Sequence, residues 1–392
     1  MKRRLDGLAV FRELLKDGAV AAFRELLQDC CRNDADNFVS HCGEFESLLF
    51  QQSDCWTAYL RRAVMESENV CIRNWASGTV TAVQEECLDR ELAFLDRLSQ
   101  VTLDDLTAGL DNAPAFLVSW RTEGGSIAQD YRQRMQEVGE KGYGIFARYH
   151  MFTVENGQLA PVKHPDPQQL EQLPGYEQER QKVIANTQAL LDGKPANNVL
   201  LYGDAGTGKS SAIKAIANNF AAQGLRLVEV KKNQLYQIPD LMDALAANPL
   251  KFILFIDDLS FTSNDDNFAA LKAILEGSVG GRAQNIAVYA TSNRRHLIKE
   301  TMTDRSGDDI HESDTRQELM SLSARFGLTV TFASPDRDRY LYIVGELAKQ
   351  YGVDLDEHTL AVRSEAFAIR MGGRSARVAK QFIELCKSGV QV

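Results

Sequence analysis

A glycine-rich segment that follows an apolar run constrains this chain more than any other feature of its sequence. Residues 199–202 are predicted to form a β-strand, and GDAGTGKS follows, with Gly203, Gly208, Lys209 and Ser210 in the spacing G-x-x-x-x-G-K-[ST]. The next segment, SSAIKAIANNFAAQ, has helical periodicity. A strand, a glycine loop and a helix in this order predict a phosphate-binding loop at the edge of a parallel α/β sheet.

Each residue type in this loop has a chemical reason. Glycines let successive backbone N–H groups turn toward phosphate oxygens, and the following helix presents its positive end to them. Lys209 is expected to reach the β- and γ-phosphates, and the Ser210 hydroxyl to bind magnesium. The predicted nucleotide-binding residues are Gly203, Asp204, Ala205, Gly206, Thr207, Gly208, Lys209, Ser210 and Ser211. A dinucleotide fingerprint fits poorly, because the glycines follow the order G-x-x-G-x-G and a lysine adjoins them.

Two adjacent aspartates, Asp257 and Asp258, end the apolar run FILFI. A buried parallel strand delivers its last side chains to the carboxyl edge of the sheet, where ligands bind. Asp257 is therefore predicted to hold magnesium together with Ser210. Asp258 stands where many ATPases have a glutamate that activates water, and it is shorter by one methylene, about 1.5 Å, although an aspartate can also accept this proton. The alternative is that both aspartates only open a turn.

The patterning along the chain predicts four regions, which differ in periodicity and in turn residues. They are a mainly helical amino-terminal domain at 1–150, a β-hairpin and proline-rich linker at 151–175, an α/β core at 176–333, and a small helical lid at 334–392. Asn156-Gly157 predicts a type I′ turn in the hairpin. Ser334 and Pro335 predict the cap and first turn of the first lid helix. In the core, strands alternate with helices, which indicates a parallel sheet covered on both faces.

The composition excludes several function classes. With 392 residues and 44% hydrophobic content, the chain is long enough for two or three domains with sizeable cores. Lys and Arg number 44 against 54 Asp and Glu, and this net charge of -10 argues against a chain that binds polyanions over its whole surface. Charged residues interrupt the amino-terminal apolar stretch and no apolar run is long enough to span a membrane, so a cytoplasmic protein is expected.

The seven cysteines do not indicate a disulfide framework, since their number is odd and no secretion signal is evident. Cys30, Cys31, His41 and Cys42 are close in sequence, but they lack the paired C-x2-C spacing of a zinc site. Thiols buried in a helical core are the favoured interpretation, with a metal site as the alternative.

The phosphate loop, the acidic strand and the helical carboxyl-terminal region together resemble an AAA+ ATPase. Within that superfamily, FILFIDDLSF, ATSNRRHLI and LSARFGLTVTF resemble the bacterial family known as domain of unknown function 815, over roughly residues 145–388. That family is known as a predicted ATPase with no assigned cellular task. The Asp-Asp pair also resembles helicase loaders and transposition ATPases. The resemblance implies a P-loop NTPase core whose parallel sheet is flanked by helices, with ATP and Mg²⁺ as ligands.

Further site residues are implied by this resemblance. Asn293 matches the sensor-1 position, where a polar side chain helps to place water, and its alternative role is to cap a strand end. Arg325 matches the arginine finger that enters a neighbouring subunit's site, which implies a homo-oligomer, and its alternative is a solvated or salt-bridged arginine. Arg377 matches the sensor-2 residue, with Arg374 as the second choice.

The segment after Asn293 carries Arg294, Arg295 and Lys299. These cations suit a contact with nucleic acid or with the next subunit's nucleotide, and a solvated turn is the alternative. The polar residues 300–318 predict a mobile surface loop beside the site.

The resemblance implies a protein that hydrolyses ATP to ADP and phosphate, with Asp258, Lys209, Asn293 and Arg325 as catalytic residues. Hydrolysis is expected to drive remodelling or loading of a macromolecular partner, a protein in preference to DNA. Two alternatives from other classes are a nucleotide-dependent binding switch with little hydrolysis, which the short Asp258 favours, and a small-molecule phosphotransferase. A DNA-associated ATPase similar to helicase loaders is a variant of the first hypothesis.

Overall fold

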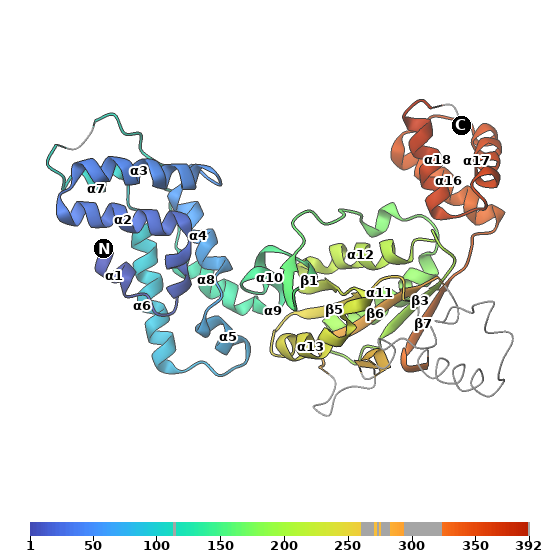
Figure 1. Ribbon diagram of the computed structural model, residues 1–392, viewed down its shortest axis with the longest axis horizontal. Helices are drawn as coiled ribbons and strands as arrows, with labels where there is room; N and C mark the ends of the chain where they lie inside the picture. Colours follow the sequence, from blue (N-terminus) through green and yellow to red (C-terminus); the bar gives the residue numbers. More distant parts are fainter. Residues whose placement is uncertain (113–114, 260–269, 273, 276–282, 294–323, 391–392) are drawn as a thin grey trace. The chain divides into compact units, whose positions relative to one another are not determined.

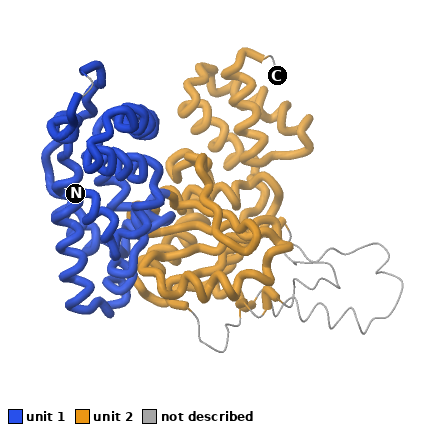
Figure 2. The backbone as a smooth tube through the Cα atoms, turned by 60° about the vertical axis from the view of Figure 1, so that its left-hand side comes forward, with its two compact units in different colours: residues 1–148 blue, residues 149–392 orange. Residues whose placement is uncertain are grey.

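The computed structural model describes residues 1–112, 115–259, 270–272, 274–275, 283–293 and 324–390. The chain divides into two compact units, Met1–Arg148 and Tyr149–Val392, each described by itself below (Figure 2). The predicted basic contact at Arg294, Arg295 and Lys299 and the predicted surface loop at 300–318 lie outside the described residues.

The first unit is built from helices, as its periodicity predicts. They are α1 (Lys2–Asp6), η1 (Arg12–Lys16), α2 (Gly18–Arg32), α3 (Ala35–Phe50), α4 (Trp56–Glu66), α5 (Val70–Ala76), α6 (Ala82–Ser99), α7 (Leu103–Thr107), α8 (Ile127–Gln136), α9 (Val138–Lys141) and α10 (Ile145–Arg148). Aromatic rings fill the core: Phe23 stacks on Trp56 at 4.6 Å, and Phe45 meets the edge of Trp120 at 4.8 Å. Because such rings bury large apolar areas, this unit has a core of its own.

The cysteine and histidine cluster near α2 and α3 makes contacts within the helices. His41 Nδ1 lies 2.6 Å from Asp29 Oδ2, and the Cys30 thiol donates to the Leu106 carbonyl. Cys42 is buried, and burial raises the pKa of its thiol to about 12. Within the described residues, no group of three or more His, Cys, Asp or Glu side chains is arranged to hold a metal ion.

The second unit contains a sheet in which seven strands are described. They are β1 (Met151–Glu155), β2 (Gln158–Pro161), β3 (Val199–Gly203), β4 (Leu225–Glu229), β5 (Lys251–Ile256), β6 (Ile286–Ser292) and β7 (Leu328–Phe332), in the spatial order β2-β1-β4-β5-β6-β3-β7. Only the β1–β2 pair among them is antiparallel. The carboxyl ends of β3, β5 and β6 therefore meet at one edge of the sheet, as the sequence predicts (Figure 1).

The predicted β-hairpin is present and has an unpredicted role. Asn156 and Gly157 have φ values of 50° and 77°, the left-handed conformations that a type I′ turn requires. β1 also pairs in parallel with β4, where Phe152 lies opposite Val228. The hairpin therefore extends the sheet, because a strand edge with unpaired N–H and C=O groups accepts a further strand.

The helices of the second unit form two sets: one packs on the sheet, and the other forms a carboxyl-terminal group. The first set is η2 (Leu170–Gln172), α11 (Glu177–Leu191), α12 (Lys209–Phe220), η3 (Ala221–Gln223), η4 (Lys232–Gln237) and α13 (Ile238–Ala246). Alternate strand residues such as Leu201 and Ile253 share one core with Val183 of α11 and Ile213 of α12. The lid helices are α16 (Arg337–Tyr351), α17 (Glu357–Arg370) and α18 (Ala376–Lys387), which group together in Figure 1.

The predicted start of α16 is wrong by two residues. Asp336 is the N-cap, and its carboxylate accepts the N–H of Arg339 at 2.8 Å. Ser334 instead donates both its backbone N–H and its hydroxyl to Asp204, at 2.8 and 2.7 Å. Asp is as good a cap as Ser, and the contact with Asp204 holds Ser334 away from the helix end.

Nowhere in the part of the chain that the structure describes does a helix combine the length and apolar character that a membrane crossing needs.

Candidate functional site

A cavity of about 420 Å³ opens at the carboxyl edge of the sheet, and its size is typical of small-molecule sites, which measure about 300 to 1,000 Å³. It is bordered by the phosphate loop, the end of β5, the end of β6, the segment before α11 and the lid helices α16 and α18. The predicted site residues that line it are Ala205, Gly206, Thr207, Gly208, Lys209, Ser210, Ser211, Asp257, Asp258, Asn293 and Arg377.

The phosphate loop turns where glycines allow it. Gly203 has φ 139°, and a Cβ there would lie 2.0 Å from the Phe332 carbonyl oxygen of β7, so any side chain would collide with the neighbouring strand. Gly208 has φ 93° and is the N-cap of α12, which begins at Lys209. The loop therefore places the positive amino-terminal end of α12 at the cavity, where an anion binds favourably.

Lys209 is buried, with 5% of its surface exposed, and its ammonium group has acceptors on every side. Its Nζ donates to the carbonyls of Gly203 and Asp204 at 2.9 and 2.8 Å, and to Asn293 Oδ1 at 2.9 Å. Burial lowers the pKa of Lys209, and the nearby carboxylates of Asp204, Asp257 and Asp258 partly oppose this effect. The lysine is thus aimed into the cavity by backbone carbonyls, and its third partner is an exposed side chain.

The two aspartates after β5 have different partners. Asp257 Oδ1 accepts the hydroxyl protons of Ser210 at 2.6 Å and of Thr291 at 2.5 Å. Asp258 has φ 51°, a left-handed conformation that is rare for residues other than glycine, and its Oδ1 accepts from Asn293 Nδ2 at 2.8 Å. The fold therefore brings the phosphate loop, both acids and the predicted sensor-1 residue into one hydrogen-bonded cluster.

The oxygens in this cluster suit a magnesium ion. Ser210 and Asp257 supply a hydroxyl and a carboxylate oxygen beside the phosphate loop, and Mg²⁺ prefers oxygen ligands. The predicted metal pair therefore fits the group that it is expected to hold.

The sequence offered two lid arginines, Arg377 and Arg374, as candidates for the sensor-2 position, and one of them reaches the cavity. Arg377 of α18 lines the cavity, and its backbone N–H donates to the Gly206 carbonyl of the phosphate loop at 3.0 Å. Arg374 forms a two-pronged ion pair with Glu365 of α17, at 2.9 and 2.6 Å, which raises the pKa of Arg374. Because its guanidinium is used within the lid, Arg374 is not the residue that the lid presents to the cavity.

Three predicted site residues are absent from the cavity lining. Gly203 and Asp204 support the loop from behind: their carbonyls hold Lys209, and the Asp204 side chain accepts from Ser334. These hydrogen bonds from Ser334 lower the pKa of Asp204. Arg325 lies half-buried just before β7, and it is not among the described residues that line this cavity.

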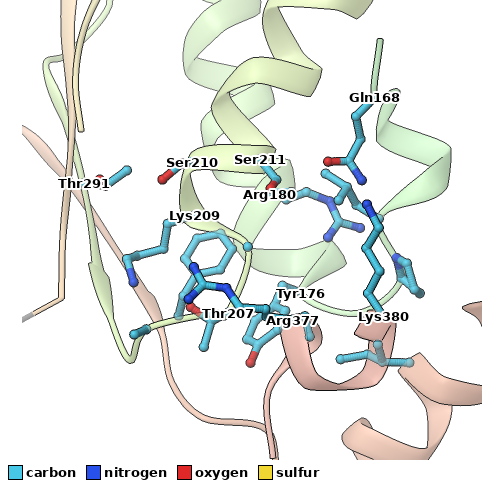
Figure 3. A pocket seen from close by; sticks show the side chains of 18 of the residues that line it. Gln168, Tyr176, Arg180, Thr207, Lys209, Ser210, Ser211, Thr291, Arg377 and Lys380 are labelled. Carbon is cyan, nitrogen blue, oxygen red and sulfur yellow. The ribbon is translucent and has the colours of Figure 1, made fainter. Parts of the chain in front are cut away.

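The sequence did not predict the far end of the cavity: Gln168 lies in the stretch interpreted as a linker, 161–175, and Arg180 and Lys380 lie on the helices α11 and α18. Figure 3 shows Thr291, Ser210 and Lys209 at one end, and Gln168, Arg180 and Lys380 at the other. Tyr176 connects this region to β7: its ring stacks on Phe332 at 5.2 Å and its hydroxyl donates to the Ala333 carbonyl at 2.6 Å. The residue pattern does not predict this role, because the wall combines residues that are far apart in the sequence.

The strand order and this cluster have the arrangement of the P-loop fold of the AAA+ type. The phosphate-loop strand β3 and the acidic strand β5 flank β6, which carries the polar residues Thr291 and Asn293, and a helical lid follows the last strand. The chain belongs to the family described as "Protein of unknown function (DUF815)", whose model matches residues 146–390.

Solved structures with a similar fold were found, and one of them is a RuvB structure. A structure of a RuvB mutant from Thermotoga maritima has a TM-score of 0.37 and 17% sequence identity, over 55% of this chain and 63% of that one. The match thus spans less than two thirds of the RuvB chain. Among curated proteins, none matches this sequence.

Proposed function

We propose that this chain binds MgATP in the cavity, hydrolyses it to ADP and phosphate, and couples the nucleotide state to the remodelling of a macromolecular partner. The single observation that carries the proposal is the hydrogen-bonded cluster in which Lys209, Asn293 and Asp258 adjoin Ser210 and Asp257. Phosphoryl transfer needs a phosphate cradle, a metal site and a group that positions water, and this cluster offers a candidate for each.

Each residue has a role that its contacts support. Lys209 exchanges its contact with Asn293 for phosphate oxygens, because a phosphate is a stronger acceptor than a side-chain amide. Asp258 orients the attacking water and accepts its proton, while Asn293 holds that carboxylate in place. Ser210 and Asp257 would hold a magnesium ion, which would neutralise phosphate charge.

The charge of the cavity favours a polyphosphate. Its described lining has four cationic side chains, Arg180, Lys209, Arg377 and Lys380, against the two carboxylates Asp257 and Asp258. The chain as a whole has a net charge of -10, so this local excess of positive charge stands out from the rest of the molecule. A concave site of one sign attracts ligands of the opposite sign.

Arg325 is proposed to complete the site of a second copy of this chain. An arginine that acts between subunits lies away from its own phosphate loop, and the position of Arg325 outside the cavity lining agrees with this role. The proposed partner of the assembly is a protein in preference to DNA, because the net negative charge disfavours a polyanion.

The test is ATP turnover by Asp258→Asn and Arg325→Ala. Removing the proton acceptor is expected to lower kcat by about 100-fold or more, while nucleotide binding persists. Asp354→Asn, which neutralises an exposed aspartate between α16 and α17, is the matched control and retains the parental rate. Parental turnover by both Asp258→Asn and Arg325→Ala would contradict these roles.

A second candidate is a nucleotide-dependent switch that turns over little ATP. It is favoured by the contact between Asp258 and Asn293, which occupies one oxygen of the carboxylate that would accept the proton. Assembly that follows ATP binding with negligible hydrolysis would support this candidate over the first.

A further inference from the structure

Thr291, at the end of β6, lies between the two aspartates and was not singled out by its sequence. Its side chain is buried, with 2% of the residue exposed. The hydroxyl donates to Asp257 Oδ1 at 2.5 Å and accepts the backbone N–H of Asp258 at 2.9 Å. Its backbone carbonyl accepts the N–H of Leu259 at 2.7 Å. One residue of β6 therefore holds three successive residues of the turn that follows β5.

The contact with Asp257 bears on the proposed metal site. In the described part of the chain, the hydrogen bonds made by this carboxylate all fall on Oδ1, which accepts from Ser210, Thr291 and the N–H of Asp258. Oδ2 is therefore the oxygen that a metal ion or its water ligands would use. Since Thr291 and Ser210 both donate to this one oxygen, rotation of the carboxylate would break both hydrogen bonds.

The contact with Asp258 bears on the proposed proton acceptor. Asp258 has φ 51°, and such a conformation persists at a non-glycine residue when surrounding contacts hold it. The Thr291 hydroxyl meets the Asp258 N–H, and Asn293 meets the carboxylate of the same residue at 2.8 Å. The hydrogen bond from the Asp258 N–H to Thr291 fixes the direction in which the Asp258 side chain leaves the turn. The hydrogen bond from Asn293 then fixes the position of the carboxylate.

We propose that Thr291 is a positioning residue for hydrolysis, in which one buried hydroxyl sets both the metal-holding carboxylate of Asp257 and the water-activating carboxylate of Asp258. This inference rests on the proposed ATPase function and deepens it. Thr291 acts through the two aspartates and is not itself a catalytic residue. Its methyl group lies on a buried strand, so valine fills the same space and removes only the hydroxyl.

The experiment compares Thr291→Val with Thr291→Ser in the intact chain. Thr291→Val is expected to lower kcat by at least about tenfold and to raise the Mg²⁺ concentration that gives half-maximal turnover, because both carboxylates lose a fixed orientation. Thr291→Ser retains the hydroxyl and is expected to stay within about twofold of the parental kcat.

Thr187→Val is the matched control for the loss of a buried hydroxyl. Thr187 of α11 is fully buried, donates to the Val183 carbonyl at 2.9 Å, and is not among the described residues that line the cavity. It is expected to lower thermal stability without changing kcat or the Mg²⁺ dependence. An effect of Thr291→Val that equals that of Thr187→Val on every readout would overturn the positioning role.

A second readout separates this inference from the proposed function. Binding of a fluorescent ATP analogue is titrated with Mg²⁺ in the parent and in both Thr291 variants, so that no turnover is needed. If the parent binds the analogue in a Mg²⁺-dependent way but does not hydrolyse ATP, the proposed ATPase activity is contradicted. The role of Thr291 in positioning the carboxylates can still be tested by binding. In that case, loss of the Mg²⁺ dependence in Thr291→Val, with recovery in Thr291→Ser, supports the inference, and an unchanged dependence overturns it.

Discussion

The two units of this chain both bury charged side chains, but they use them differently. In the first unit, Glu91 is 8% exposed and accepts three backbone N–H groups, from Ala9 at 2.6 Å, Val10 at 3.2 Å and Phe11 at 3.0 Å. In the second unit, Lys209 is 5% exposed, yet one of its partners is the exposed side chain of Asn293 at a cavity. Glu91 is held by backbone N–H groups and by the Cys87 thiol of its own helix, so its charge is part of the framework. The charge of Lys209 shares a side-chain partner at a cavity and can exchange that partner for a ligand.

The largest expected effect comes from removing the charge of Lys209, which can exchange its partner for a ligand. Lys209→Met is expected to weaken MgATP binding by about 100-fold or more, because a buried charge-assisted contact with phosphate is lost. Isothermal titration with MgATP measures it, and Lys182→Met, which removes an exposed lysine on α11, is the control. Unchanged affinity in Lys209→Met would remove the distinction between the two units.

Removing the framework charge gives the next largest effect. Glu91→Ala is expected to destabilise the first unit by about 2 kcal/mol, because three N–H groups lose their acceptor. MgATP affinity should stay at the parental value. Denaturant unfolding and titration together check this, with Glu44→Ala at an exposed position of α3 as the control. A loss of nucleotide affinity without a loss of stability would contradict the assignment of Glu91 to the framework of the first unit.

Two arginines of the lid, Arg374 just before α18 and Arg377 on it, extend the same comparison between a framework charge and a charge at the cavity. Arg377→Ala is expected to weaken MgATP binding by about tenfold, since a cation at the cavity is lost. Arg374→Ala breaks the ion pair with Glu365 and should leave the affinity unchanged, with only a small loss of stability, because solvent screens this ion pair. If Arg374→Ala weakened nucleotide binding more than Arg377→Ala, the assignment of Arg377 to the site would be wrong.

The smallest expected effect concerns the pH dependence of stability at Asp204. Hydrogen bonds from Ser334 lower the pKa of Asp204 below its ordinary value of 3.8. A carboxylate with a lowered folded pKa stabilises the fold above the unfolded value, and this contribution is lost as pH falls below 3.8 through the folded pKa. The contribution should be below about 1 kcal/mol, because Asp204 is exposed.

Thermal unfolding of the parent and Asp204→Asn between neutral pH and pH values below about 4 measures this contribution. The difference in Tm is expected to be largest at neutral pH and to shrink in acid. A Tm difference that stays constant across this pH range would show that the charge of Asp204 does not contribute to stability.

The sequence predicted the second unit best where local pattern and position coincide. The strand before the phosphate loop, the strand that ends at Asp257 and the turn at Asn156-Gly157 each have a short signal that the structure bears out. The sequence predicts Ser334 as the N-cap of α16, with Pro335 in the first turn, whereas Asp336 is the cap and Ser334 contacts Asp204, a partner that lies far away in the sequence.

Other features depend on contacts between distant segments. Thr291 is far in sequence from Asp257, and its role appears only because β6 pairs with β5. The choice between Arg374 and Arg377 depends on Glu365, a partner on another helix. The far end of the cavity joins Gln168, which lies in a proline-rich segment with no helical or strand period, to Arg180 of α11 and Lys380 of α18. Such contacts have no signature in spacing, so the residue pattern alone does not identify them.

The central claim is that the phosphate loop and the acidic strand form one site for a magnesium-bound triphosphate. A crystal structure of the intact chain with a non-hydrolysable ATP analogue and Mg²⁺ tests it most directly. The account predicts the terminal phosphate beside Lys209, whose ammonium has left Asn293, with the metal between Ser210 and Asp257. A nucleotide bound elsewhere, with Lys209 still holding all three of its present partners, would contradict it.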